Sequence, residues 1–153
     1  MRSAPRRALA PPLKRLKEVI HAGDFVYCRS KRYRDSLQLP QEVGVVIEIK
    51  RASHKLLYAS DRRAWVPREA LVRMDPPADS TEFMRTLNYL LRRVDAHECE
   101  VVAVDGINQL SARIDRIDHT TVDELRKYLG GRFISITVVP EGMAFMQVEI
   151  VFR

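Results

Sequence analysis

The hydrophobic pattern of the chain changes at residues 75–80, and this change limits the folds open to it. Before it, apolar side chains come in short alternating runs that are typical of strands. After it, apolar side chains recur at the spacing of one helix face: Phe83, Leu87, Leu90, Leu91 and Val94. The stretch between, DPPADS, carries two prolines and predicts a linker, with Asp79 or Ser80 capping the helix. We therefore expect a mixed α+β chain of two small units, with a strand-rich unit first.

Five short strands are predicted in the first unit, residues 21–74. Their sequences are DFVYCR, GVVIEI, KLLYA, AWVP and LVRM. The residues SDRR between the third and fourth strands have the length and composition of a hairpin turn. Pro67 lacks a backbone donor and should end the fourth strand, and REAL should form one helical turn. Trp65 is expected in the core of this unit, beside Phe25 and Ile47.

This order of elements resembles an SH3-like barrel. The shared features are a strand after Gly-Asp, a long basic loop, a strand that opens with Gly44, a hairpin, and Trp65-x-Pro67 before a short turn and a last strand. Tudor, chromo-barrel and KOW-type modules have this plan, and small uncharacterised bacteriophage proteins have a similar layout. The resemblance covers residues 22–74, about half of the chain, and its motifs identify a fold better than a ligand. It implies an interaction module.

The second unit, residues 81–153, has the predicted order αββαββ. Strands CEVVAV and LSARIDRI are joined through DGINQ, and FISITVV and MAFMQVEIVF form a later hairpin. The helix between the two pairs, TVDELRKYL, is expected to start with a capping box from Thr121 to Glu124. The order fits either an internal duplication or a permuted ferredoxin-like plan, with two helices covering an antiparallel sheet. The last strand is expected to be an exposed edge.

Charge is distributed unevenly along the chain. Residues 1–75 hold 17 Lys or Arg against 8 Asp or Glu, whereas residues 76–153 hold 9 against 12. A basic half joined to a mildly acidic half indicates one surface for polyanions and another for a different partner, although the basic residues of a small domain also serve simply to solvate it. The first 20 residues form a basic Arg/Pro arm and a short helix with Leu13, Leu16 and Ile20 on one face.

The basic side chains of the first unit are the candidate binding residues. They fall in the first long loop, around the next turn and at the hairpin, with one tyrosine among them whose ring is able to stack on a base. The candidates for nucleic-acid binding are Arg29, Lys31, Arg32, Tyr33, Arg34, Lys50, Arg51, Lys55, Arg62 and Arg63. In an SH3-like barrel these loops converge at one rim, so a contiguous positive patch is predicted.

The sequence offers little for catalysis. It contains no phosphate-binding GxxxxGK[ST] or GxGxxG motif and no GxSxG nucleophile turn. The segment HECE places His97 and Cys99 on one strand face, but no second pair follows at zinc-site spacing. A set of acids with one histidine invites the hypothesis of a two-metal nuclease, which we keep as a third alternative: Asp105, Asp115, Asp118, His119 and Glu149. No catalytic residue, metal or cofactor is predicted.

We therefore predict a non-enzymatic protein whose basic barrel contacts nucleic acid or a nucleoprotein particle through phosphates. The second unit is expected to dimerise or to bind a protein partner; the main alternative is a structural or assembly protein of a bacteriophage virion. No apolar run approaches the 18 to 20 or so residues of a membrane helix, and Cys28 and Cys99 form no disulfide framework, so a cytoplasmic or virion-associated protein is expected. The first 17 residues are rich in Arg, Ala and Pro and contain no acid, so a transit peptide is an alternative interpretation of this segment.

Overall fold

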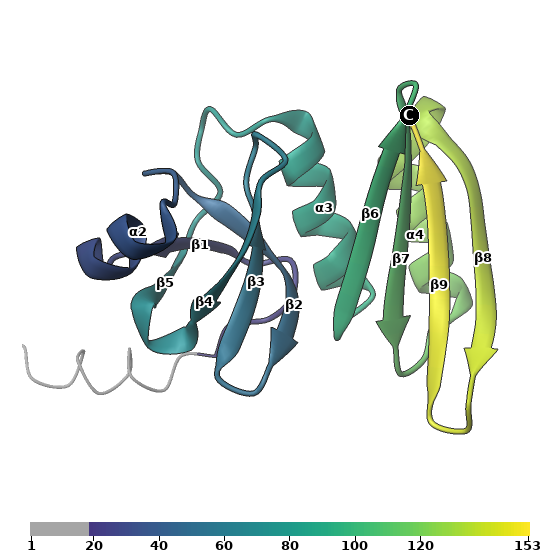
Figure 1. Cartoon of the computed structure of the whole chain (residues 1–153). Helices are drawn as coiled ribbons and strands as arrows, with labels where there is room; N and C mark the ends of the chain where they lie inside the picture. Colours follow the sequence, from purple (N-terminus) through teal and green to yellow (C-terminus); the bar gives the residue numbers. More distant parts are fainter. Residues whose placement is uncertain (1–18) are drawn as a thin grey trace, which may run out of the picture.

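The computed structural model describes residues 19–153, which form a mixed α+β structure with antiparallel strands (Figure 1). The expected basic arm lies outside these residues, as does the expected first helix up to residue 18. Between residues 19 and 153, no helix is long and apolar enough to cross a membrane.

The mixed α+β class predicted from the sequence is confirmed. Between residues 19 and 153 the chain forms nine strands: β1 (Phe25–Cys28), β2 (Gly44–Lys50), β3 (Ser53–Leu57), β4 (Arg63–Pro67), β5 (Leu71–Met74), β6 (Glu98–Val104), β7 (Ile107–Ile114), β8 (Phe133–Glu141) and β9 (Phe145–Phe152). Three α-helices lie in the same part of the chain: α2 (Lys31–Leu37), α3 (Glu82–Arg93) and α4 (His119–Leu129). Short 3-10 turns follow β4 (Arg68–Ala70), as REAL predicted, and α4 (Gly130–Arg132).

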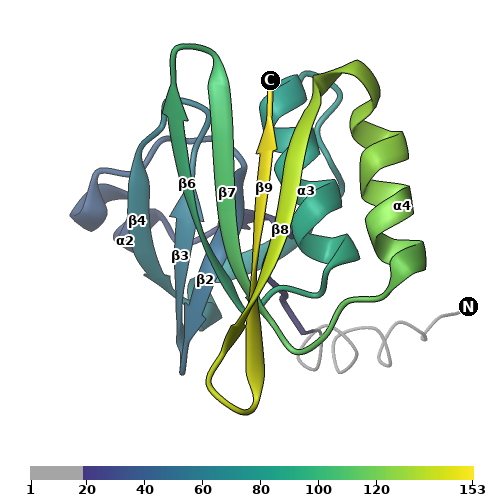
Figure 2. The same ribbon diagram turned by 90° about the vertical axis from the view of Figure 1, so that its right-hand side faces the viewer.

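All strands are hydrogen-bonded into one antiparallel network. The main path runs β4-β3-β2-β6-β7-β9-β8, and β1 pairs with both β2 and β5. A single residue pair, Glu48 of β2 opposite Glu98 of β6, joins the strands before residue 75 to those after it. Helices α3 and α4 lie on the same side of the β6–β9 strands, so the other face of these strands carries no helix (Figure 2).

The edge strand of the second half is β8. The expectation that the last strand is the edge is wrong, because β9 lies between β7 and β8. The reason is the composition of β9, whose Val148, Ile150 and Phe152 are all buried beneath the helices, a position that favours the middle of a sheet. Position in the chain does not fix position in the sheet.

Two buried clusters hold the structure together. The larger one joins β1–β3 side chains such as Phe25 and Ile47 to Leu87 and Leu91 of α3 and to Ile150 of β9. The smaller one lies within β1–β5 and has these buried members: Ile20, Val26, Cys28, Leu39, Val46, Leu56, Tyr58, Val66, Ala70 and Leu71. Because β2 alternates, Val45 and Ile47 enter the larger cluster while Val46 enters the smaller one. Helix α3 therefore packs against strands from both halves of the chain.

Helix α3 begins one residue later than the sequence suggested. The hydroxyl of Thr81 accepts a hydrogen bond from the Met84 N–H at 3.2 Å and is the N-cap. Ser80, an expected cap, instead donates its hydroxyl to the Pro77 carbonyl at 2.7 Å and tightens the preceding turn. The predicted apolar face is confirmed, since the helix buries Leu87, Leu90 and Leu91 completely.

Helix α4 begins two residues before the expected capping box. Asp118 is the N-cap, and its carboxylate accepts the Thr121 N–H at 2.8 Å, a hydrogen bond that lowers the pKa of Asp118. Glu124 does not reach back to Thr121; it accepts two hydrogen bonds, of 2.7 and 2.9 Å, from Arg93 of α3. These bonds lower the pKa of Glu124 and connect the two helices. The capping-box expectation is wrong because a better acceptor, Asp118, lies three residues before Thr121.

Part of the expected basic loop is helical. Residues Lys31–Leu37 form α2, whose N-cap Ser30 accepts the Tyr33 N–H at 3.3 Å. Gln38 ends the helix in the left-handed region at φ 54°. The signals for this short helix, a Ser cap and an i,i+4 pair of Lys31 with Asp35 at 3.3 Å, were present in the sequence.

Candidate nucleic-acid interface

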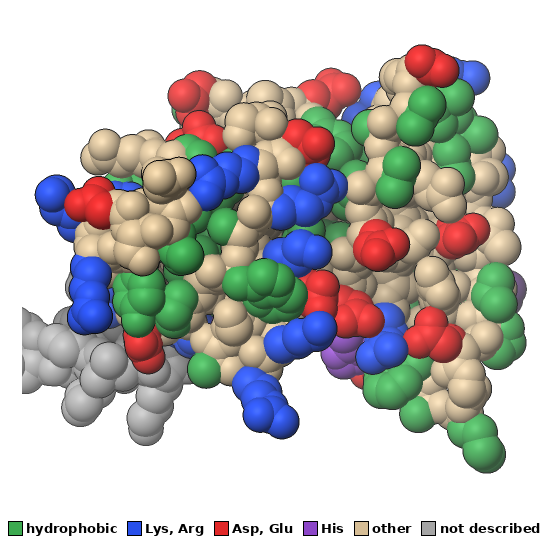
Figure 3. Space-filling model, viewed as in Figure 1, with side chains coloured by type: hydrophobic (Ala, Val, Ile, Leu, Met, Phe, Trp, Pro, Cys, Tyr) green, Lys and Arg blue, Asp and Glu red, His purple; other side chains and the backbone are tan. Residues whose placement is uncertain are grey.

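One row of side chains crosses seven strands and includes the helix-free face of β6–β9 (Figure 2). Direct cross-strand neighbours share a face of a sheet, so the strand register places the whole row together. From β4 to β8 the row is Trp65, Lys55, Glu48, Glu98, Arg113, Gln147 and Val139. Lys and Arg side chains gather over β2–β4, and Asp and Glu side chains begin at the junction with β6 (Figure 3).

Trp65 lies on this open face and not in the core. The expectation that it packs with Phe25 and Ile47 is wrong, because its side chain is 38% exposed while both of those residues are buried. The strand alternation explains the result: Val66, the next residue, is 0% exposed and fills the smaller cluster, so Trp65 must point outward.

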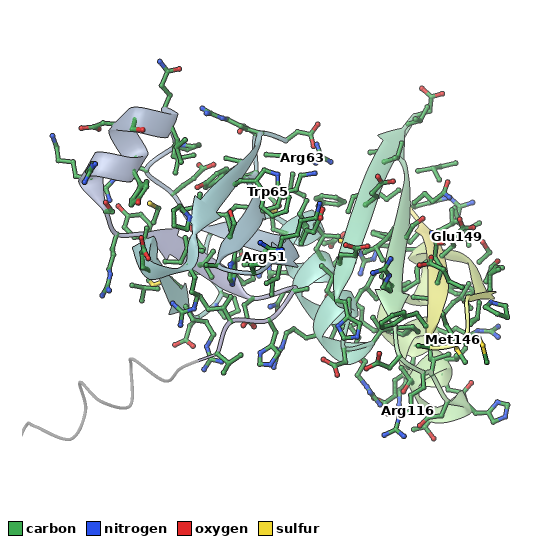
Figure 4. The ribbon with its side chains drawn as sticks, turned by 60° about the horizontal axis from the view of Figure 1, so that its bottom comes forward. Arg51, Arg63, Trp65, Arg116, Met146 and Glu149 are labelled. Carbon is green, nitrogen blue, oxygen red and sulfur yellow. The ribbon has the colours of Figure 1, made fainter. Side chains whose placement is uncertain are left out.

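Two lysines flank the Trp65 indole. The Nζ of Lys50 lies 5.6 Å from the ring centre and the Nζ of Lys55 lies 5.9 Å from it. Both distances are within the range of a cation–π contact. Arg51 follows Lys50 in the β2–β3 turn, where its φ is 53°, and Figure 4 shows Arg51, Trp65 and Arg63 in succession along the small sheet.

The cations near Trp65 are only lightly neutralised. Lys50 has an ion pair with Glu48 at 3.4 Å, yet 69% of its side chain is exposed. Among the side chains of residues 19–153, no carboxylate lies within ion-pair distance of Arg51 or Lys55. We call Lys50, Arg51, Lys55 and Trp65 the sheet-face group.

The remaining candidates before β2 lie elsewhere. Arg29, Lys31, Arg32, Tyr33 and Arg34 are on or beside α2, at the end of the molecule away from β6 (Figure 1). Arg34 is committed to the fold, because its guanidinium donates to the Cys28 carbonyl at 2.7 Å and lies 5.5 Å from the Tyr27 ring centre. The structure therefore has two separate basic regions where the sequence suggested one contiguous patch.

Arg62 and Arg63 are hydrogen-bonded to backbone carbonyls. Arg62 donates to the carbonyls of Leu37 and Gln38 and so closes the C-terminal end of α2. Arg63 donates to the Val101 carbonyl of β6 at 3.1 Å and pairs with Asp61 at 3.1 Å. Their charge contributes to the local potential, but their first role in this structure is to hold the β3–β4 hairpin against its neighbours.

An acidic border begins one strand from Lys55. Glu48 and Glu98 face each other across β2 and β6, a like-charge pair that costs stability. Lys50 at 3.4 Å from Glu48 and Arg113 at 3.7 Å from Glu98 offset that cost. Glu98, Glu100 and Arg113 also line a groove of about 340 Å³ between β2 and β7. Carboxylates therefore begin on β2 and continue on β6, whereas the row side chains of β3 and β4 are Lys55 and Trp65.

The acids considered for a nuclease do not meet at one point. Asp105 lies in the β6–β7 turn, and Asp118 caps α4. Asp115 follows the end of β7, with an oxygen 2.9 Å from Nε2 of His97. Glu149 lies on the open face and receives a 3.5 Å hydrogen bond from Gln109.

His97 and Cys99 do not form a ligand pair. Their shared strand face was an expectation, but His97 is exposed before β6 begins, whereas Cys99 is buried and its pKa is raised to about 12 by burial. Within the part of the chain that the structure describes, no three His, Cys, Asp or Glu side chains are grouped as a metal ion requires.

Comparisons with protein-family models, with curated protein sequences and with solved structures found no match to this chain.

Proposed function

We propose that this chain is a non-enzymatic interaction protein whose small SH3-like barrel, residues 21–74, contacts the phosphates of nucleic acid through its sheet-face group. The observation that carries the proposal is the gathering of Lys50, Arg51 and Lys55 around Trp65 on β2–β4 and the turn between β2 and β3, with little carboxylate to neutralise them (Figure 4). A positively charged surface of this kind is the electrostatic footprint of nucleic-acid binding.

The acidic border supports the same proposal. Arg113 is the main cation on the β6–β7 part of the row, and it is already paired with Glu98 at 3.7 Å and Glu141 at 3.2 Å. A polyanion is therefore attracted to one half of the open face and repelled by the other. This polarity favours a defined path along β2–β4 over diffuse attraction to a basic protein.

Salt dependence tests the proposal. Each phosphate contact contributes a slope of about −0.7 to −0.9 to the logarithm of affinity against the logarithm of salt concentration. The triple variant Lys50→Gln, Arg51→Gln, Lys55→Gln should flatten the slope by roughly two units or more, as measured by anisotropy of labelled DNA and RNA.

A charge-matched control separates a site from net charge. The variant Arg29→Gln, Lys31→Gln, Arg32→Gln also removes three positive charges, but from the region around α2. We expect it to change affinity much less than the sheet-face variant. Equal weakening by both variants contradicts the proposed site, and absence of binding by the wild type at low salt contradicts the proposed function.

A second candidate, an assembly role for residues 81–153, is favoured by the β8 edge. Its exposed apolar side chains are Ile134, Val138 and Val139, and residues 133–139 contain no charge that would discourage strand addition. This edge would pair with an extended strand of a protein partner or of another copy. Sedimentation of the wild type and of Val139→Lys tests self-association: a concentration-dependent increase in mass that Val139→Lys removes supports it, and a monomer at all concentrations contradicts self-association.

A further inference from the structure

We infer that the ligand of the sheet-face group is a single-stranded nucleic acid, and that one of its bases stacks on Trp65. The inference rests on the proposed function and adds the class of nucleic acid and the contact to the base. Two observations carry it. The first is the exposure and surroundings of Trp65. The second is the narrow width of the basic surface over β2–β4, which we call the basic strip, beside the acidic border.

Trp65 has the setting of a stacking platform. Trp65 is 38% exposed on a sheet surface, and two ammonium groups lie within 6 Å of its ring centre. Proteins that bind single strands combine such aromatic rings with cations that follow the phosphate backbone. The face of a base is apolar and its phosphates are charged, so a single nucleotide meets both features of this surface at once.

The alternative role for Trp65, packing within the fold, is already filled by others. Val66 provides the buried contact of β4, and the smaller cluster is complete without the indole. The Nζ atoms of Lys50 and Lys55 lie 5.6 and 5.9 Å from the ring centre, and Trp65 is still 38% exposed. An exposed Trp between lightly neutralised cations is therefore available for a ligand.

The width of the basic strip decides whether the ligand is a single-stranded nucleic acid or a duplex. Adjacent strands of a sheet are about 4.8 Å apart, so β4 to β2 spans roughly 10 Å. Glu48 already lies on β2, and the next strand, β6, presents Glu98 and Glu100 on the same face. A duplex carries two phosphate backbones on either side of grooves that are about 6 and 12 Å wide, so its second backbone would meet the acids or pass beyond the β4 edge. One backbone fits the strip.

The chain contains one tryptophan, so its fluorescence reports directly on stacking at Trp65. The probes are oligothymidine and oligouridine of about 12 nucleotides, a mixed-sequence duplex of the same length, and an abasic strand with the same number of phosphates. We expect both single strands to quench Trp65 fluorescence on binding and the abasic strand to bind without comparable quenching. The duplex should bind more weakly than either single strand at the same salt concentration.

Two matched variants test the stacking contact. Trp65→Leu should weaken single-strand binding by about tenfold while leaving the salt slope unchanged, and Trp65→Phe should restore part of the loss. Phe145→Leu is the control, because Phe145 is also an exposed aromatic residue, 37%, with Arg113 at 5.1 Å from its ring centre, but it lies among the acids. Circular dichroism spectra of all variants should match that of the wild type.

The outcomes separate this inference from the function on which it rests. Binding without quenching, equal affinity for duplex and single strand, or equal losses in Trp65→Leu and Phe145→Leu overturns the stacking inference and leaves phosphate binding intact. Failure of every probe to bind at low salt overturns both. A higher affinity for oligothymidine would identify DNA as the preferred ligand, and a higher affinity for oligouridine would identify RNA.

Discussion

Replacement of Gly23 by alanine tests a close contact between the segment before β1 and helix α3. Gly23 lies before β1 with φ +94°, its N–H donates to the Val46 carbonyl at 2.7 Å, and its carbonyl accepts the Asn88 side-chain amide at 2.7 Å. A Cβ added at Gly23 would lie 2.8 Å from the Leu91 Cβ and 3.1 Å from the Arg92 N. Neither neighbour is the far end of a flexible side chain. The substitution therefore has to strain the backbone of Gly23 and also move it away from α3.

The two contributions have separate magnitudes. The left-handed conformation costs a residue with a Cβ about 1–2 kcal/mol, and overpacking of a tight site costs about 1–3 kcal/mol. Gly23→Ala should therefore lower the free energy of unfolding by about 2–5 kcal/mol.

Two other glycines provide the controls. Gly106, at φ +77° and with no atom within 4 Å of an added Cβ, isolates the backbone cost of about 1–2 kcal/mol. Gly131 has neither a positive φ nor a close neighbour, so Gly131→Ala should stabilise by about 0.4–1 kcal/mol. Urea titration followed by circular dichroism measures all three values. If Gly23→Ala cost no more than Gly106→Ala, the close contact with α3 would be refuted.

Three further predictions follow from the burial and hydrogen bonds of single residues. Trp65→Ala should lower the free energy of unfolding by less than about 1.5 kcal/mol because Trp65 is 38% exposed, whereas Phe25→Ala should lower it by about 3–5 kcal/mol because Phe25 is 2% exposed. Equal losses in urea titrations would contradict the outward placement of Trp65. The pKa values of Asp118 and Glu124 are lowered in the folded protein, so the stability that these carboxylates contribute is present above their unfolded pKa of about 4 and is lost as pH falls through the folded pKa values. The double variant Asp118→Asn, Glu124→Gln should therefore lose less unfolding free energy than the wild type between about pH 5 and pH 2. Equal losses in the two proteins would contradict this assignment. Burial raises the pKa of Cys99 to about 12, so its thiol should react with a disulfide reagent at about pH 8 only after denaturant is added, and rapid labelling of the native protein would contradict its burial.

Local structure was predictable where one signal stood without competition. The apolar spacing of α3 was visible in the sequence, since Leu87 and Leu90 are buried as expected, and the alternating segment MAFMQVEIVF contains β9, in which Val148 and Ile150 are buried. The end of β4 at Pro67 followed from the missing donor of proline. Helix starts were less certain because several residues near each start can cap, and geometry selected Thr81 for α3 and Asp118 for α4.

The sequence by itself determined the α+β class, most elements and the uneven charge, because these depend on near neighbours in the chain. It did not determine that Trp65 faces solvent: alternation puts Trp65 and Val66 on opposite faces, and only the packing of β4 decides which face is inside. It also did not determine that α2 draws part of the basic residues away from Lys50 and Lys55, or that Glu48 faces Glu98. Those facts depend on which strands pair across long stretches of chain, and strand pairing is set by tertiary structure, so only the folded molecule places a basic strip and an acidic border side by side.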